Sequence, residues 1–121
     1  MILGLDVSTT RIGWAIIDDS QNLIDSGFYK TDKKMGLEER AEDFRTNVLH
    51  PLSIVHRVGE VRVEEPFSMF SGGKTTAKTM SSLQRFNGMI SLLVLQVFGD
   101  PPTMVGSRTA RARCGIKVPR N

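Results

Sequence analysis

Residues 2–7 (ILGLDV) and 12–18 (IGWAIID) decide the fold expected for this chain. Both are short runs of apolar and β-branched residues, a pattern typical of buried strands, and the turn residues Ser8, Thr9 and Thr10 separate them. A third run with polar alternation spans residues 23–31, after a loop signal of Asp, Ser and Asn at 18–22. Three strands joined by short loops predict an antiparallel meander.

The apolar period then changes from that of a strand to that of a helix. Spacings of three and four residues predict a helix over 37–55, which Pro51 should kink or split after His50. Its expected buried stripe comprises Leu37, Ala41, Phe44, Val48, Leu52 and Val55.

A second strand–helix–strand unit completes the pattern. It consists of a strand at about 60–64 (EVRVE), a polar loop at 68–74, a helix at about 75–98 and a strand near 103–106. The helix has a stripe of Met80, Leu83, Asn87, Ile90, Val94 and Val97, with Gly88 as an unfavourable residue inside it. The order predicts an α/β fold: a mixed five-stranded sheet, three antiparallel strands followed by parallel additions, with flanking helices.

The composition indicates a single soluble domain spanning residues 1–121. The chain has 40% hydrophobic and 24% charged residues, which excludes wholesale disorder. Its longest apolar run, residues 92–95, is far shorter than the roughly 20 residues of a membrane-spanning helix. The N-terminus lacks the basic region of a signal peptide, and one cysteine cannot form an internal disulfide. We therefore expect a cytoplasmic protein with no membrane partner.

The charge is divided unequally along the chain. Residues 1–65 have eight Lys and Arg against twelve Asp and Glu, a net charge of −4. Residues 66–121 have eight against one, a net charge of +7, and Ser107 is expected to begin a short basic helical turn there. A basic half is typical of a protein that binds a polyanion, and the acidic half would then leave some carboxylates for a separate function. In the alternative interpretation, the charges cluster by chance on faces exposed to solvent.

Two acids occupy the ends of expected strands. Asp6 lies between Leu5 and Val7, and Glu64 ends the strand VRVE. Adjacent strands would bring the two carboxylates together, where they could share one divalent cation, because Mg²⁺ prefers carboxylate oxygens. In the alternative interpretation Asp6 caps the turn at residues 8–10 and Glu64 is solvated.

Three stretches resemble one known family. Residues 2–18 (ILGLDVSTTRIGWAIID) are similar to the first hairpin of the RNase H-like superfamily, and more narrowly of RuvC-type Holliday-junction resolvases. Residues 61–90 (VRVEEPFSMFSGGKTTAKTMSSLQRFNGMI) resemble the family's strand glutamate, aromatic residue, polar loop and helix. Residues 107–117 (SRTARARCGIK) resemble its basic segment more weakly.

The resemblance implies an Mg-dependent crossover junction endodeoxyribonuclease that resolves four-way DNA junctions. Asp6 and Glu64 match its catalytic, metal-binding acids, with Glu65 as the rival of Glu64. Mg²⁺ or Mn²⁺ is the implied cofactor, with Asp6 bridging two ions. The residues implied to bind DNA are Phe67, Lys74, Lys78, Arg108 and Arg111. Branched DNA and a second copy of the chain, forming a homodimer, are the implied partners.

The sequence departs from the family at its C-terminal end. Family members carry two further acids on a following helix, whereas after Glu65 this sequence has only Asp100. The expectation is thus a nuclease domain truncated at its C-terminal end, with doubtful activity of its own. A non-catalytic module that binds branched DNA is one alternative. A sugar-kinase or actin-like ATPase fragment is another, since GLDVSTT also resembles the phosphate-binding hairpin of those proteins.

Overall fold

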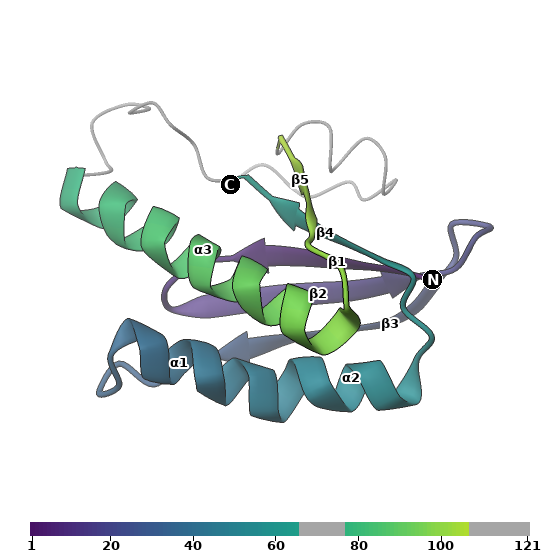
Figure 1. Ribbon diagram of the computed structural model, residues 1–121, viewed down its shortest axis with the longest axis horizontal. Helices are drawn as coiled ribbons and strands as arrows, with labels where there is room; N and C mark the ends of the chain where they lie inside the picture. Colours follow the sequence, from purple (N-terminus) through teal and green to yellow (C-terminus); the bar gives the residue numbers. More distant parts are fainter. Residues whose placement is uncertain (66–76, 107–121) are drawn as a thin grey trace.

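The computed structural model describes residues 1–65 and 77–106. Its first three elements are the strands β1, β2 and β3, and the rest alternate between helices and strands (Figure 1). The bounds are β1 Ile2–Val7, β2 Arg11–Ile17, β3 Leu23–Lys30, α1 Leu37–Phe44, the π-helical turn η1 Arg45–Leu49, α2 His50–Val55, β4 Glu60–Glu64, α3 Ala77–Phe98 and β5 Thr103–Val105.

The five strands form one mixed sheet in the order β3-β2-β1-β4-β5. β1 pairs antiparallel with β2, and β2 with β3, while β4 pairs parallel with β1 and β5 parallel with β4. The loop at 18–22 closes the second hairpin, where the Asp18 carboxylate accepts hydrogen bonds from the backbone of Ser20 and Asn22. The predicted α/β sheet is confirmed.

The helices pack on the face of the sheet that presents Leu3, Leu5 and Val63. These side chains form one core with residues of α1, η1, α2 and α3, and α3 crosses the strands in Figure 1. Because side chains alternate along a strand, Gly4, Asp6 and Glu64 belong to the opposite face. We call the first the core face and the second the open face.

The helical segment 37–55 changes its period at η1. A π-helical turn takes an extra residue, so Phe44 and Leu49, five positions apart, are both buried on the core face. Beyond Phe44 the predicted stripe is confirmed at Leu52, which is buried, but wrong at Val55, which is 72% exposed, and Leu49 replaces the partly buried Val48 in the centre of the core. Pro51 predicted a kink or split after His50. In the structure the π-helical turn η1 is followed by α2 from His50 onward, so the change lies one residue earlier.

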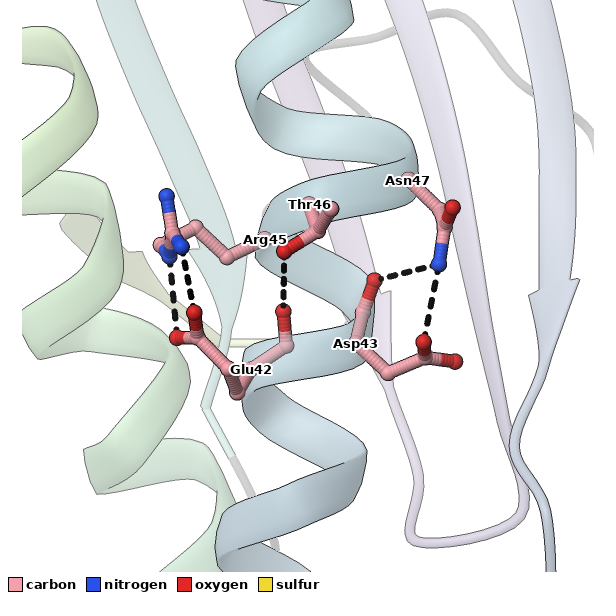
Figure 2. A network of polar contacts seen from close by, with 5 residues as sticks. All are labelled: Glu42, Asp43, Arg45, Thr46 and Asn47. Carbon is pink, nitrogen blue, oxygen red and sulfur yellow. Dashed lines mark hydrogen bonds and ion pairs between the residues drawn. The ribbon is translucent and has the colours of Figure 1, made fainter.

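Polar side chains support the residues where the helix period changes (Figure 2). The Thr46 hydroxyl and the Asn47 amide donate to the carbonyls of Glu42 and Asp43, at 3.1 and 2.9 Å. Arg45 pairs with Glu42, and its hydrogen bond holds the pKa of the Glu42 carboxyl below its ordinary value. These contacts satisfy local carbonyls at the widened turn.

The long helix α3 confirms most of its predicted stripe. Asn87, Ile90 and Val94 are buried, together with Phe86, which the pattern did not single out. Gly88 is exposed, and apart from its chain neighbours and the adjoining backbone of α3, no atom of the described residues lies within 4 Å of the position that a Cβ would take there. Within the described ranges no helix is long and apolar enough to cross a membrane.

Candidate metal and nucleic-acid site

Asp6 and Glu64 lie at the same edge of the sheet in two neighbouring parallel strands, Asp6 one residue before the end of β1 and Glu64 at the end of β4. The parallel register pairs Leu5 with Val63, so the next residues along β1 and β4 are Asp6 and Glu64. Neighbouring strands lie about 4.8 Å apart, and residues in register point to the same face. The register thus supports the predicted convergence of these two carboxylates on the open face.

Glu65 does not share this position. It follows the end of β4, and its backbone N–H donates to the Val105 carbonyl at 2.7 Å. Alternation along the chain directs residues 64 and 65 to opposite sides. Between the two rival acids, the register therefore favours Glu64 as the partner of Asp6.

The Asp6 carboxylate is exposed rather than enclosed by the described residues. Its cross-strand partner is Gly13, where an added Cβ would lie 3.9 Å from the Asp6 Cβ. A glycine at this position leaves the space beside the carboxylate open. The exposure of Asp6 in the described part of the chain leaves its oxygens accessible to a cation or a phosphate.

The turn after β1 is held by groups other than Asp6. The Ser8 hydroxyl donates to the Arg11 carbonyl at 2.7 Å and accepts the Arg11 N–H at 3.0 Å. The Thr9 carbonyl accepts hydrogen bonds from the Thr31 hydroxyl and the Arg40 guanidinium, at 2.7 and 2.9 Å. Ser8, Thr31 and Arg40 thus position the turn and leave the Asp6 side chain available for other contacts.

Asn87 connects α3 to the end of β4. Its side chain is 4% exposed, and its amide donates to the Glu64 backbone carbonyl at 3.4 Å. The sequence pattern had placed Asn87 only in an apolar stripe. A polar residue at a core position of a helix was the signal that could have identified this positioning role.

Lys78 is the one predicted DNA-binding residue that falls within the described ranges. It is exposed in the first turn of α3. Since α3 connects two parallel strands, it begins at the edge where β1 and β4 end, as Figure 1 shows. Lys78 therefore lies toward the end of the sheet that carries the two acids, but it belongs to the helix that packs on the core face, whereas the acids belong to the open face. Phe67, Lys74, Arg108 and Arg111 lie outside the described residues, as does the expected helical turn at 107–112.

The carboxylate oxygens of Asp6 and Glu64 are chemically suitable ligands for a divalent cation. Mg²⁺ is commonly held by one or two carboxylates together with phosphate oxygens. Within residues 1–65 and 77–106, no group of three or more His, Cys, Asp or Glu side chains could hold a metal. The described part of the chain therefore offers at most these two carboxylates at the end of the β1 and β4 pair.

Comparison with known sequences finds relatives of one kind. The crossover junction endodeoxyribonuclease RuvC of Aliarcobacter butzleri is 34% identical over 102 residues, and that of Campylobacter concisus is 30% identical over 105. Each match covers 82% of this chain, and the chain spans about 60% of the length of these relatives. No family model matches the chain.

Solved structures show the same architecture. The Thermus thermophilus RuvC in complex with a Holliday-junction substrate aligns with a TM-score of 0.71 at 20% identity, covering 92% of this chain and 67% of that one. A second Thermus thermophilus RuvC structure aligns with a TM-score of 0.59. The mixed five-stranded sheet with flanking helices is thus an RNase H-like fold. Within that class, the sequence matches confirm the resemblance to the RuvC-type Holliday-junction resolvases.

Proposed function

We propose that this chain belongs to a structure-selective endonuclease. In this proposal the chain recognises four-way DNA junctions, and it contributes Asp6 and Glu64 to their cleavage. The observation that supports the proposal is the register of β1 and β4, in which Leu5 pairs with Val63 and the residues that follow are Asp6 and Glu64. The likeness to RuvC sequences supports the choice of substrate.

Each residue of the site has a defined task in this proposal. Asp6 and Glu64 would hold Mg²⁺ or Mn²⁺, and Lys78 would bind a phosphate of the DNA. The bound cation would supply Lewis-acid activation of the phosphodiester and of an attacking water. Gly13 keeps the space beside Asp6 open for the phosphate. Phe67, Lys74, Arg108 and Arg111 extend the DNA-binding surface, with Phe67 stacking on a base near the crossover.

A second candidate function is binding of branched DNA without cleavage. It is favoured because no group of three or more His, Cys, Asp or Glu side chains among the described residues could hold a metal. The two functions share the same DNA surface and differ only in whether a metal-dependent nick follows.

A homodimer is part of the proposal, and α3 offers a surface for it. Leu92 and Leu95 are 54% and 41% exposed, and Gly88 precedes them by one turn. Positions 88, 92 and 95 share one side of a helix. A glycine there lets a second helix approach closely, so we place the dimer contact on this side of α3.

Binding to a synthetic four-way junction and to a linear duplex of the same sequence tests the substrate class. We expect tighter binding to the junction, with affinity falling steeply as salt rises because phosphate contacts release counterions. Gel shifts over a salt series measure both. Equal affinity for the duplex would contradict the proposal.

Nicking of the junction in Mg²⁺ or Mn²⁺ tests the reaction. Asp6→Asn and Glu64→Gln should abolish nicking and leave junction binding unchanged or tighter, because a negative charge beside the phosphate is removed. Glu60→Gln, at the far end of β4, is the matched control and should nick as the original chain does. Junction binding without any nicking in either metal would select the second candidate.

A further inference from the structure

The turn that follows β1 determines how firmly Asp6 is held. In the ladder between β1 and β4 the last pair is Leu5 with Val63, so Asp6 lies beyond it. On its other side Asp6 pairs with Gly13, which has no side chain to pack against it. The backbone of Asp6 is therefore fixed by β2 alone and by the turn at residues 8–10 that joins β1 to β2.

This turn lacks the backbone conformation that is usual in short hairpins. Such turns commonly contain residues with positive φ, which match the twist of the two strands. Among the non-glycine residues that the structure describes, only Gln21 has a positive φ, so Thr9 and Thr10 do not form a turn of this kind. The Arg11 N–H donates to the Ser8 hydroxyl at 3.0 Å. The conformation of the turn therefore depends on hydrogen bonds from side chains.

Two side chains from outside the hairpin bind the Thr9 carbonyl. The hydroxyl of the buried Thr31, directly after β3, donates to it at 2.7 Å, and Nη1 of Arg40 on α1 donates at 2.9 Å. A carbonyl oxygen has two lone pairs, so both are used. The Thr31 N–H also donates to the Thr10 carbonyl, at 3.0 Å. The turn after β1 is thus fixed both to the end of β3 and to α1.

The Arg40 guanidinium binds three backbone carbonyls at once. Besides its bond to Thr9, its Nε donates to the Met35 carbonyl at 2.8 Å and its Nη2 to the Lys33 carbonyl at 3.3 Å. One planar group therefore connects the loop before α1 to the turn after β1, and both segments lie at the left end of the sheet in Figure 1. A lysine ammonium lacks this fork of donors in one plane. Among the described residues, Arg40 forms no ion pair with a carboxylate.

We propose that Arg40 and Thr31 are positioning residues for Asp6. They fix the turn after β1, and through the backbone they fix the place of the Asp6 carboxylate that is to bind the cation. The inference rests on the proposed function, in which Asp6 is a metal ligand. It needs no free surface, because every contact that carries it lies within the described part of the chain.

The affinity for Mn²⁺ at Asp6 tests this role, and broadening of the Gly13 amide signal during a titration reports it. Arg40→Met and Thr31→Val should each weaken the affinity by about 10- to 100-fold, as expected when a group that orients a metal ligand is lost. Arg40→Lys should not restore it, because an ammonium cannot bind the three carbonyls together. Thr31→Ser keeps the hydroxyl and should restore it. Thr31→Val is nearly isosteric and tests the same carbonyl even if Arg40→Met fails to fold.

Arg45→Met is the matched control. Arg45 lies in η1, directly after α1, and its guanidinium pairs with Glu42 rather than with the turn. Its loss removes the same charge and should leave the Mn²⁺ affinity unchanged. Equal weakening in Arg45→Met would assign the effect to the lost charge and overturn the inference.

Two further readouts distinguish positioning from general support of the fold. In the metal-free chain, Arg40→Met should speed amide exchange at Ser8, whose N–H donates across the turn to the Arg11 carbonyl, while exchange in the middle of β1 stays slow. With a four-way junction, Arg40→Met and Thr31→Val should lower the rate of nicking at saturating DNA. The affinity for the junction should stay unchanged, because neither side chain is assigned a DNA contact.

The outcomes separate this inference from the proposed function. If Arg40→Met and Thr31→Val lower only the melting temperature, with Mn²⁺ affinity and nicking rate unchanged, the positioning role is overturned and the proposed function stands. If both weaken Mn²⁺ binding in a chain that binds linear duplex as tightly as the junction, the positioning role stands and the proposed function is overturned. Absence of Mn²⁺ binding at Asp6 in the original chain would overturn both.

Discussion

The two faces of the sheet differ in how deeply their side chains are buried. On the core face Leu3 and Val63 are fully buried beneath the helices. On the open face the same strands present Asp6, which is exposed, and β3 presents Phe28, which is 62% exposed. Neighbouring residues of one strand therefore have different surroundings: one side is buried in the core, and the other is exposed among the described residues. Matched substitutions on the two faces should therefore have different effects on stability.

The largest difference is expected between Leu5 and its neighbour Asp6. Leu5→Ala leaves a cavity in the core and should lower the free energy of unfolding by about 2–5 kcal/mol. Asp6→Asn changes an exposed group and should alter it by no more than about 0.5 kcal/mol. Urea denaturation measures both variants. A comparable loss in Asp6→Asn would show that the acid has a structural role.

Two glycines on opposite faces give the next comparison. A Cβ at Gly27 would lie 2.8 Å from Cζ2 of the Trp14 ring on the core face, whereas at Gly4 the nearest atom is the Ala15 carbonyl oxygen at 4.0 Å. Gly27→Ala should therefore destabilise the protein by about 1–3 kcal/mol through overpacking. Gly4→Ala is the control, and thermal unfolding should show a clearly smaller change. Similar effects at both positions would contradict the close packing of Trp14.

Asn87 connects the core to the strand that carries Glu64. Its side chain is buried, and its amide donates a hydrogen bond to the backbone carbonyl of Glu64. Asn87→Ala removes that donor and should cost about 0.5–1.5 kcal/mol of stability. Mn²⁺ binding should also weaken, since the end of β4 loses its support. Calorimetry of Mn²⁺ binding checks this, with the exposed Gln96→Ala as control. Unchanged metal affinity would restrict Asn87 to a packing role.

The smallest effect is expected on the outer side of α3. Gly88→Ala should stabilise the isolated chain by about 0.5–1 kcal/mol, because glycine is a poor helix former and nothing described lies close to it. If Gly88 lies in a dimer contact, the same change should weaken self-association, which sedimentation at several concentrations measures. A more stable chain with unchanged association would remove Gly88 from the dimer surface.

Local patterns were sufficient to predict the strands of this protein. The apolar runs and turn residues at positions 2–31 gave β1, β2 and β3 to within a residue or two, and the order of elements gave the mixed sheet. The adjacency of Asp6 and Glu64 followed from that order, because parallel neighbours end at the same edge.

Other features depend on contacts that no local pattern contains. The π-helical turn inserts one residue into the helical period, so Val55 turned outward although its spacing matched the stripe. The role of Asn87 depends on β4, which is 23 residues away in the chain. The pairing of Arg11 with Phe28 requires the hairpin register, which joins positions that show no relation in sequence.

The central claim is that Asp6 and Glu64 bind one cation together, and paramagnetic Mn²⁺ tests it most directly. In nuclear magnetic resonance spectra, Mn²⁺ should broaden the amide signals near Asp6, Gly13 and Glu64 at concentrations that leave the rest of the sheet unaffected. This local broadening should disappear in Asp6→Asn and in Glu64→Gln but persist in Glu60→Gln. Broadening that is centred elsewhere, or that survives in either of the first two variants, would contradict the account.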